Sequence, residues 1–499
     1  MVMPPASERS AAPFASQQFV DSSSAVPVRG YQFLLLLFTI AGAALRVLHL
    51  GAKGLWLDEP LTVAIARLPW PQFTQNWLYG EAAYQGVYFL WMRAWLRFGN
   101  TEAWIRLPSA LFAIASIPLL YALARRLIGE KAALAAALLF ALSPTHVYYS
   151  QEARGYTMTI LLVLASTWSF VRAVQEDRER DWLLWVVFST IAFYSHLFSC
   201  LVLLAQAASL LALREPRIWR RMIFHALLIM ALCAPGLSFV LRGPPHGPSH
   251  PDWPRATPKQ VLHLALFLGG SGEKVVLSAI LWIAALGAIW RDRLRKPEPE
   301  VFWRGVLLVL WVIVPVAILA LVSIRIPLFV QRYMIFCLPA TVMLAARGMI
   351  ALPKHHLGLW LVLALCVSSI VNIFVGYRKP REDWRNATAA VLASAHPGDA
   401  VAIYPNYARP GFDYYYDLRR SSAPAVHLFG RFYDTGKDDS EFEQALNRDP
   451  GAFPRVWIML RDGTPERDYS PEVAAKLQTI FGPPHSQKFV GITVLEFNH

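Results

Sequence analysis

Charged residues are scarce in this sequence of 499 residues: Asp, Glu, Lys and Arg together make up 16% of it. A soluble globular domain has about 25%. Apolar residues reach 55%, which excludes an intrinsically disordered chain, because such chains contain too few apolar side chains to form a core. The apolar residues also gather in runs that are too long for a globular core, so we do not expect an ordinary soluble enzyme.

Cysteines and nucleotide-binding motifs are equally sparse. The four cysteines lie inside apolar runs without the spacing of metal ligands; they are Cys200, Cys233, Cys337 and Cys366. This placement favours small buried side chains over a disulfide framework. The sequence contains no P-loop, no G-x-G-x-x-G motif and no internal repeat, so nothing in it indicates a bound nucleotide.

Basic residues exceed acidic ones, with 47 Lys and Arg against 34 Asp and Glu and a net charge of +13. The excess lies in short clusters between apolar runs and not on one polar domain. That distribution is typical of a membrane protein, whose cytoplasmic loops are rich in Lys and Arg. It argues against a nucleic-acid partner, which would require a basic face on a folded domain.

Eleven apolar runs are candidates for membrane-spanning helices, which need about 20 mostly apolar residues. They cover residues 31–50, 107–124, 132–148, 156–173, 182–195, 197–213, 222–241, 274–290, 305–323, 333–350 and 357–376. The fifth and sixth runs are short and close together, so each could be tilted or re-entrant.

Basic clusters predict the orientation of these helices. They lie in the loops at residues 125–131, 172–180, 214–221 and 291–304, which we therefore expect in the cytoplasm. Eleven spans then place the N-terminus inside and the C-terminus outside. Residues 1–30, rich in Ser, Pro and Ala, are expected to form a disordered cytoplasmic tail before a helix that is retained and not a cleaved signal peptide.

Two regions outside the spans are large. Residues 51–106 combine interrupted apolar stretches with six tryptophans, which predicts juxtamembrane helices that lie in the interface. In residues 377–499 short apolar runs alternate with charge, and strands are expected at 401–404, 455–460 and 489–497. The predicted fold class is an all-α polytopic membrane bundle over residues 31–376 with a C-terminal soluble α/β domain over 377–499, outside the membrane.

Four polar clusters could carry chemistry, and the predicted topology places them all on the outer side. They are Asp58-Glu59, the turn from Tyr148 to Tyr156 with Glu152 and Arg154, Tyr194-Ser195-His196, and Arg325 with Gln331-Arg332-Tyr333. Each alone has an ordinary explanation: solvated acids, a local ion pair, a hydrogen-bonded histidine, or an arginine on a lipid headgroup. Together they place acids that can act as base or metal ligand beside arginines that can hold a phosphate. This combination favours a reaction on a lipid-phosphate substrate.

Several segments, taken in order, carry a resemblance to a known family. They are Leu57-Asp58-Glu59, Arg106-Leu107-Pro108-Ser109-Ala110, Ser143-Pro144, Tyr149-Ser150-Gln151-Glu152-Ala153-Arg154, Tyr194-Ser195-His196, Arg332-Tyr333 and Asp383-Trp384-Arg385. The chain resembles the polyprenyl-phosphate-dependent glycosyltransferases of the GT-C superfamily. It is most similar to the family-39-like group, related to protein O-mannosyltransferases and lipid A aminoarabinose transferases. The resemblance extends over residues 31–390.

The resemblance implies a GT-C bundle, a sugar donor linked to a polyprenyl phosphate such as undecaprenyl phosphate, and a lipid, lipopolysaccharide or protein acceptor in a bacterial envelope. It implies that Asp58 is the catalytic carboxylate, with Glu59 beside it and Glu152 as a further acid. An acceptor hydroxyl has to lose its proton to a carboxylate as the new bond forms. The phosphate leaving group needs cations, for which Arg154 and Arg332 are the candidates. Direct displacement would invert the anomeric configuration.

Three further residues are candidates for substrate binding: His196, Tyr333 and Gln85. Gln85 lies in the stretch Ala83–Tyr88, where much of the family has a His-Pro-Pro or Lys-Pro-Pro element. The loss of that element weakens the case for a metal ion. The resemblance still allows a divalent ion at Asp58 and Glu152, although no ligand spacing requires one, and no other cofactor is expected.

Two other classes of function remain open at this point. A flippase or transporter for a lipid-linked substrate would need polar residues along the depth of the bundle, whereas these clusters lie at one face. A non-catalytic scaffold of an envelope glycan complex would tolerate the missing His-Pro-Pro element. The leading hypothesis is a glycosyltransferase in the bacterial inner membrane, with its active site and C-terminal domain in the periplasm.

Overall fold

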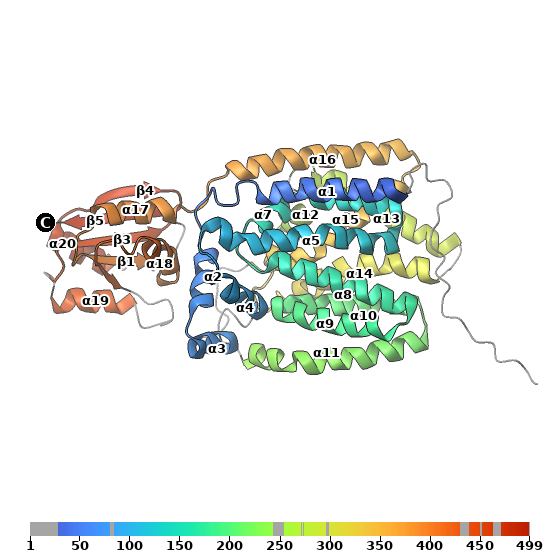
Figure 1. Ribbon diagram of the computed structural model, residues 1–499, viewed down its shortest axis with the longest axis horizontal. Helices are drawn as coiled ribbons and strands as arrows, with labels where there is room; N and C mark the ends of the chain where they lie inside the picture. The colour runs from blue at the N-terminus through green and yellow to red at the C-terminus, as the bar shows by residue number, and fades with distance from the viewer. Residues whose placement is uncertain are drawn as a thin grey trace, which may run out of the picture.

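The computed structural model describes residues 28–79, 84–242, 254–270, 272, 274–295, 299–429, 439–449, 452–462 and 471–498. These residues form a bundle of long helices with a smaller α/β domain at one end (Figure 1). Most of the predicted tail, residues 1–30, lies outside the described residues, and its last three residues begin the first helix.

The bundle buries large tryptophan side chains, and two of them show how their ring N–H groups are paired. Trp185 donates its ring N–H to Gln206 at 2.8 Å, and Trp303 donates to Ser209 at 3.0 Å. Such pairing allows a tryptophan to be buried without a lost hydrogen bond. The helices are α1 (Val28–Val47), α5 (Glu102–Ile128), α6 (Glu130–Ala141), α7 (Pro144–Ser150), α8 (Tyr156–Glu176), α9 (Glu179–Ser195), α10 (Cys200–Ser209), α11 (Pro216–Arg242), α12 (Pro258–Gly269), α13 (Lys274–Arg295), α14 (Pro299–Val322), α15 (Leu338–Ala351) and α16 (His355–Arg378), with a 3-10 helix, η4 (Gln331–Cys337), before α15.

All eleven predicted runs are helical, but length and apolarity support fewer complete spans. Among the described residues, eight helices could cross a membrane, or nine if α6 and α7, which meet at a bend of 53°, form one broken span. The other two are the fifth and sixth predicted spans: α9 has 17 residues, and the helix at Leu197–Ala212 is also short. A helix of 17 residues is about 25 Å long, less than the ~30 Å of the hydrocarbon core. The eleven predicted runs are therefore located correctly; eight or nine of them meet the length and apolarity of a complete span, and the fifth and sixth are short, as their sequences indicate.

The basic loops gather at one end of the bundle. Arg126 at the end of α5 pairs with Glu176 at the end of α8, at 2.6 Å. Arg221 near the start of α11 pairs with Asp177, just after α8, at 2.8 Å. The α/β domain and three short helices lie at the opposite end (Figure 1), so the structure agrees with the predicted alternation of the loops.

Close packing joins α13 to α15. A Cβ atom added at Gly348 would lie 1.8 Å from the carbonyl oxygen of Leu281, so only glycine fits there. Small residues let membrane helices approach one another closely in this way. A Cβ atom at Gly287 on α13 would meet no atom within 4 Å, which makes it a useful reference position.

Three short helices cross the end of the bundle that carries the α/β domain (Figure 1): α2 (Asp58–Arg67), α3 (Trp70–Tyr79) and α4 (Gly86–Trp95). Trp95 stacks on Trp104 of α5 with ring centroids 4.5 Å apart. Each of the two rings donates its N–H to the backbone carbonyl of the other residue, at 2.8 and 3.3 Å. These contacts attach α4 firmly to the start of α5.

The α/β domain is built on a five-stranded sheet of order β2-β1-β3-β5-β4. Strand β1 is parallel to β2 and β3, whereas β5 is antiparallel to β3 and β4. All five residues of β1 are buried, as expected for a parallel strand covered on both faces. The elements are α17 (Trp384–Ser394), β1 (Ala400–Tyr404), α18 (Arg409–Leu418), β2 (His427–Phe429), α19 (Asp439–Arg448), β3 (Arg455–Arg461), α20 (Pro471–Phe481), β4 (His485–Phe489) and β5 (Ile492–Asn498).

One face of this domain rests on the bundle. The hydroxyl of Tyr415 on α18 accepts a hydrogen bond from the backbone N–H of Leu55 at 2.7 Å. Arg385 on α17 pairs with Glu102 at the start of α5, at 2.9 Å. The loop between α1 and α2 is therefore held between the bundle and the α/β domain.

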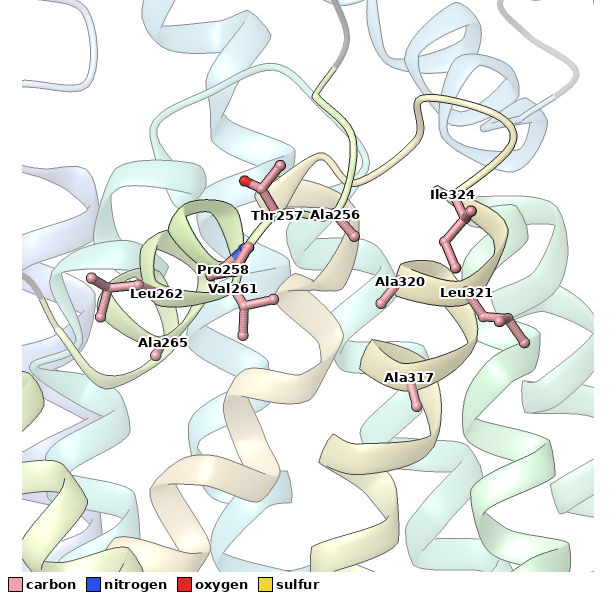
Figure 2. A pocket seen from close by; sticks show the side chains of 10 residues that line it. All are labelled: Ala256, Thr257, Pro258, Val261, Leu262, Ala265, Ala317, Ala320, Leu321 and Ile324. Atoms are coloured by element: carbon pink, nitrogen blue, oxygen red, sulfur yellow. The ribbon is translucent and has the colours of Figure 1, made fainter.

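An apolar groove of about 770 Å³ lies between α12 and the last turns of α14 (Figure 2). Its lining includes Val261, Leu262, Ala265, Ala317, Ala320 and Leu321. Gln260 of α12 accepts a hydrogen bond from Gln331 at 3.4 Å, and Gln331 is followed by Arg332. The apolar groove therefore lies beside the segment that carries one of the predicted phosphate-binding arginines.

Candidate functional site

Four separate segments meet where the α/β domain joins the bundle. They are the start of α2, the turn between α7 and α8, the 3-10 helix η4, and the segment between α16 and α17. Ion pairs connect all four: Asp58 with Arg154 and with Arg332, and Arg381 with Glu59 and Glu152. The structure thus brings the acids and arginines that the sequence nominates into one cluster.

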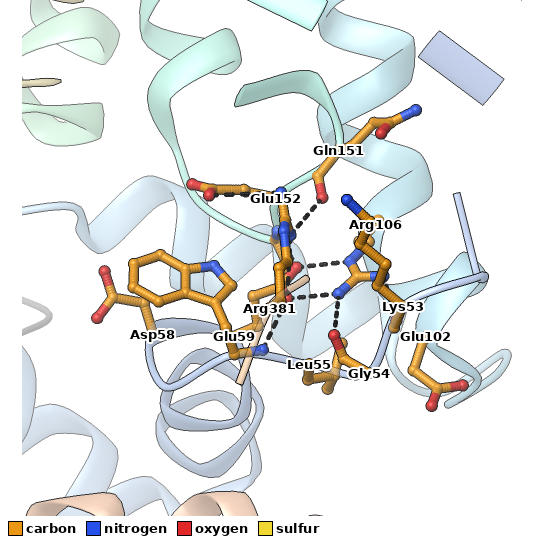
Figure 3. A network of polar contacts seen from close by, with 12 residues as sticks. Lys53, Gly54, Leu55, Asp58, Glu59, Glu102, Arg106, Gln151, Glu152 and Arg381 are labelled. Atoms are coloured by element: carbon orange, nitrogen blue, oxygen red, sulfur yellow. Dashed lines mark hydrogen bonds and ion pairs between the residues drawn. The ribbon is translucent and has the colours of Figure 1, made fainter. Parts of the chain in front are cut away.

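Glu59 is completely buried and forms a two-pronged ion pair with Arg106 (Figure 3). The two hydrogen bonds measure 2.6 and 2.7 Å. The backbone N–H groups of Ala153 and Trp56 also donate to this carboxylate, at 2.9 and 3.2 Å. Burial alone would raise the pKa of Glu59, but Arg106 and Arg381 outweigh it and lower the pKa below its usual value. Glu59 is therefore ionised, and its acceptor sites are occupied by the protein itself.

Arg106 uses its remaining N–H groups to fix the loop that leads to α2. It donates to the carbonyl oxygens of Leu50, Lys53 and Gly54, at 2.8 to 2.9 Å. Because Arg106 belongs to the long helix α5, these bonds attach the loop to a rigid element. The position of Asp58, four residues after Gly54, follows from this anchor.

Asp58 is the first residue of α2, and its carboxylate differs from that of Glu59 in its hydrogen bonding. Its carboxylate lies 3.9 Å from Arg154 and 3.9 Å from Arg332, which is ion-pair range but too long for a hydrogen bond. Its Oδ2 atom accepts no hydrogen bond from the described residues. In Figure 3 the carboxylate points away from Arg106 and Glu59. Asp58 is therefore an acid with free acceptor capacity beside two cations.

Glu152 is a second acid, only 1% exposed, in the turn between α7 and α8. Arg381 approaches its carboxylate to 3.7 Å. Burial raises the pKa of Glu152 to about 7; Glu59 and Asp58 also raise it, and Arg381 lowers it. A carboxyl group with this pKa changes charge near neutral pH.

Aromatic rings surround the arginines. His196 and Tyr333 have ring centroids 5.5 Å apart, and Tyr156 lies 6.2 Å from His196. The guanidinium of Arg332 lies 5.8 Å from the centre of the Tyr333 ring. His196 and Tyr333 therefore lie in the same cluster as Arg332, and all three are residues that the sequence nominates for substrate binding.

Gln85 occupies the residue before α4 and is 5% exposed. Its side-chain oxygen would lie 3.2 Å from a Cβ atom added at Gly155, so it faces the turn that carries Glu152 and Arg154. That oxygen accepts no hydrogen bond from the described residues. Of the neighbouring stretch Ala83–Tyr88, Ala83 lies outside the described residues.

Two residues of this cluster are not among the site residues predicted from the sequence: Arg381 and Glu382. Arg381 is largely buried, lies within 3.8 Å of Glu59, and stands over the ring of Tyr148 at 5.0 Å. A signal for it does exist in the sequence, because Arg378, Lys379 and Arg381 follow the last span on the predicted outer side. Basic residues there oppose the positive-inside trend, just as Arg332 does.

The donor set fits a metal ion poorly. Within the part of the chain that the structure describes, no three His, Cys, Asp or Glu side chains gather as metal ligands would. Asp58 and Glu152 are flanked by Arg154, Arg332 and Arg381, whose positive charges oppose a further cation. These positive charges suit an anion better than a further cation.

Comparisons with known proteins agree with the fold. A family described as dolichyl-phosphate-mannose-protein mannosyltransferase matches residues 84–239, while none of the curated proteins matches the chain. The crystal structure of ArnT from Cupriavidus metallidurans bound to undecaprenyl phosphate is 13% identical, with a TM-score of 0.59 over 92% of this chain and 97% of that one. Its apo state has the same identity and TM-score over 93% and 98%. An oligosaccharyltransferase from Archaeoglobus fulgidus in complex with Zn and sulfate is 10% identical, with a TM-score of 0.49 over 93% and 72%.

These findings confirm the predicted fold class and agree with the resemblance to the GT-C glycosyltransferases. The identity to ArnT is low, so the likeness concerns the arrangement of the helices and of the α/β domain.

Proposed function

We propose that this chain, which has the fold of the GT-C glycosyltransferases, transfers a sugar from a polyprenyl-phosphate donor to a hydroxyl group of an envelope acceptor. One observation carries the proposal. The Asp58 carboxylate, with no hydrogen bond at its Oδ2 atom, lies between two arginines at the end of a bundle whose surface carries an apolar groove. A base, an anion site and a lipid site are the three requirements of this reaction.

The donor is argued from the groove and the arginines together. The groove between α12 and α14 is lined almost entirely by apolar side chains, which suits an isoprenoid chain. Arg332 and Arg154 can donate charge-assisted hydrogen bonds to a phosphate. The undecaprenyl phosphate bound to ArnT and the description of the matching family, which names a dolichyl phosphate sugar, support a donor of this class.

The reaction follows from the placement of the charges. As the acceptor oxygen attacks the anomeric carbon, Asp58 takes the hydroxyl proton. The bond between the anomeric carbon and the phosphate oxygen breaks, and Arg154 and Arg332 stabilise the negative charge that the lipid phosphate gains. A single displacement inverts the anomeric configuration. Glu152, when ionised, stabilises the positive charge that develops on the sugar ring, which has oxocarbenium character in such transition states.

Glu59 has a different task in this proposal, although the sequence places it beside Asp58 as a catalytic acid. Its carboxylate accepts four hydrogen bonds from Arg106, Ala153 and Trp56. A carboxylate that is saturated in this way has no free lone pair for a substrate proton. We propose that Glu59 supports the loop that carries Asp58. No step of the proposed reaction involves a metal ion.

The orientation is part of the proposal. The basic loops at the far end of the bundle would face the cytoplasm of a bacterium, and the candidate site and the α/β domain would face the periplasm. The acceptor would then be a lipid, a lipopolysaccharide or a protein of the envelope. His196, Tyr333 and Gln85 would line the space for the donor sugar.

The test is a transfer assay with purified protein in detergent. A panel of radiolabelled undecaprenyl-phosphate sugars is offered together with an envelope extract, and wild type is compared with Asp58→Asn. Transfer from one donor that is lost in the variant supports the proposal. Folded protein that transfers nothing from any donor rejects it, and movement of the labelled lipid across a vesicle membrane would then identify a flippase.

A further inference from the structure

The segment between α16 and α17 connects the α/β domain to both candidate acids. Through Oε1, Glu382 accepts a hydrogen bond from Arg461 at the end of β3 at 2.9 Å and forms an ion pair with the same guanidinium at 2.7 Å. Its Oε2 atom accepts from the backbone N–H of Leu57 at 3.4 Å and from the ring N–H of Trp384 at 3.2 Å. One side chain thus joins a strand of the α/β domain to the residue that precedes Asp58.

The contact with Leu57 matters because α2 lacks a cap of its own. Leu57 is the N-cap residue, and its apolar side chain accepts no hydrogen bond from the first N–H groups of the helix. The first N–H groups of a helix have no partner within the helix, and a carboxylate near them is favoured by the helix dipole. Glu382, more than 320 residues away in the sequence, provides such a carboxylate to the turn that holds Asp58.

Arg381 performs the matching task for Glu152. Its guanidinium lies 3.7 Å from Glu152 and 3.8 Å from Glu59, and it donates to the backbone carbonyl of Gln151 at 3.4 Å. The charged and titratable groups that face Glu152 are Arg381, Glu59 and Asp58, with Tyr148 and Tyr149 on α7 and Tyr88 on α4. Arg381 is the cation among the groups that set the charge of Glu152.

The α/β domain fixes this segment at several points. The backbone N–H of Asp383 donates to the carbonyl of Val490 at 2.9 Å, in the turn between β4 and β5. Arg385 pairs with Glu102 and donates to the carbonyl of Gly51 at 3.3 Å. A shift of the domain would therefore move Arg381 and Glu382 together.

We propose that the α/β domain completes the active site from a distance: Arg381 and Glu382 are positioning residues for Glu152 and Asp58, and Arg461 of β3 holds Glu382 in place. This inference rests on the proposed function for its catalytic readout. None of the three residues needs to touch the substrate. The domain thereby contributes to turnover even when the acceptor binds elsewhere.

The experiment compares Arg461→Gln and Arg381→Gln with a matched control, Arg455→Gln. Arg455 begins the same strand and also forms ion pairs, with Asp399 at 3.3 Å and Glu496 at 3.5 Å, but these partners lie within the α/β domain. Couplings of this kind change a rate by about 3- to 30-fold. We expect Arg461→Gln to lower kcat by that factor with the donor KM unchanged, and Arg455→Gln to retain the wild-type kcat.

The pH profile separates a positioning role from a merely structural one. Removal of the positive charge in Arg381→Gln should move the acidic limb of the kcat profile to higher pH, and Arg381→Lys, which keeps the charge, should restore most of the shift. Identical profiles for wild type, Arg381→Gln and Arg455→Gln, in an enzyme that transfers sugar, would overturn the inference and leave the proposed function intact.

A second readout does not depend on turnover. Amide hydrogen exchange of residues 55–59 should be faster in Arg461→Gln than in wild type and Arg455→Gln, because the Glu382 contact with Leu57 is loosened. Equal exchange in all three proteins would refute the inference even if no donor is ever found, whereas failure of the transfer assay alone would refute only the proposed function.

Discussion

Asp58 and Glu59 are adjacent acids, and the structure predicts that neutralising Asp58 lowers the rate of transfer whereas neutralising Glu59 lowers the stability of the fold. Successive residues of a helix point about 100° apart, so at the start of α2 one carboxylate faces Arg154 and Arg332 and the other faces Arg106. The variants are Asp58→Asn and Glu59→Gln, each of which removes the negative charge and preserves the shape. Both are purified in detergent and compared with wild type.

The cost of Glu59→Gln can be worked out from its contacts. Arg106 is 2% exposed and would keep its positive charge in the absence of a counter-charge. The new amide NH₂ would also face N–H donors that Glu59 now accepts from. Removing one partner of a buried ion pair costs about 3–5 kcal/mol. Because the pKa of Glu59 is lowered in the folded state, its stabilisation is present above its unfolded pKa and is lost as the pH falls through the folded value.

Asp58→Asn is expected to affect the rate of sugar transfer and not the stability of the fold. Its ion pairs span 3.9 Å without a hydrogen bond, so the free energy of unfolding should change by no more than about 1 kcal/mol. Loss of a general base lowers the rate by about 10²- to 10⁴-fold. Thermal unfolding gives the change in stability and sugar transfer gives the change in rate, both measured on the same preparations. Equal destabilisation by the two variants, or full transfer by Asp58→Asn, would refute the division of tasks.

Four further outcomes are expected. Arg332→Gln should weaken binding of undecaprenyl phosphate about 10-fold or more, because a hydrogen bond to a charged group contributes ~1.5–3 kcal/mol; unchanged binding in a direct assay would contradict the anion site. The wild-type kcat should rise as the pH increases through about 7, where Glu152 loses its proton, and a flat profile would remove that acid from the mechanism. Ala320→Trp should raise the KM for a long-chain donor and not for a short-chain analogue, whereas an equal effect on both would exclude the groove as the lipid site. Gly348→Ala should lower the melting temperature in detergent, with Gly287→Ala as control, and equal melting of the two variants would argue against close packing there.

The helices and the placement of the polar clusters could be predicted from the sequence because they depend on local properties. The length of an apolar run decides whether it can cross a membrane, and basic residues between the runs decide which loops share a side. The same local rule does not decide whether α9 and residues 197–212 span the membrane. There a pattern of apolar residues was present, but the helices are short.

The tasks of individual acids and arginines were decided only by the tertiary structure. Glu59 is paired with Arg106, 47 residues away in the sequence. Glu382 accepts a hydrogen bond from Leu57 at the start of α2, 325 residues away. No local pattern encodes such a contact, because it depends on which side chains the packed helices and the α/β domain bring within 3 to 4 Å. The sequence by itself determined a membrane bundle with a polar cluster at one end. Packing determined which carboxylate is buried and paired, which one keeps free acceptor capacity beside two arginines, and that the α/β domain contributes Arg381 to the cluster.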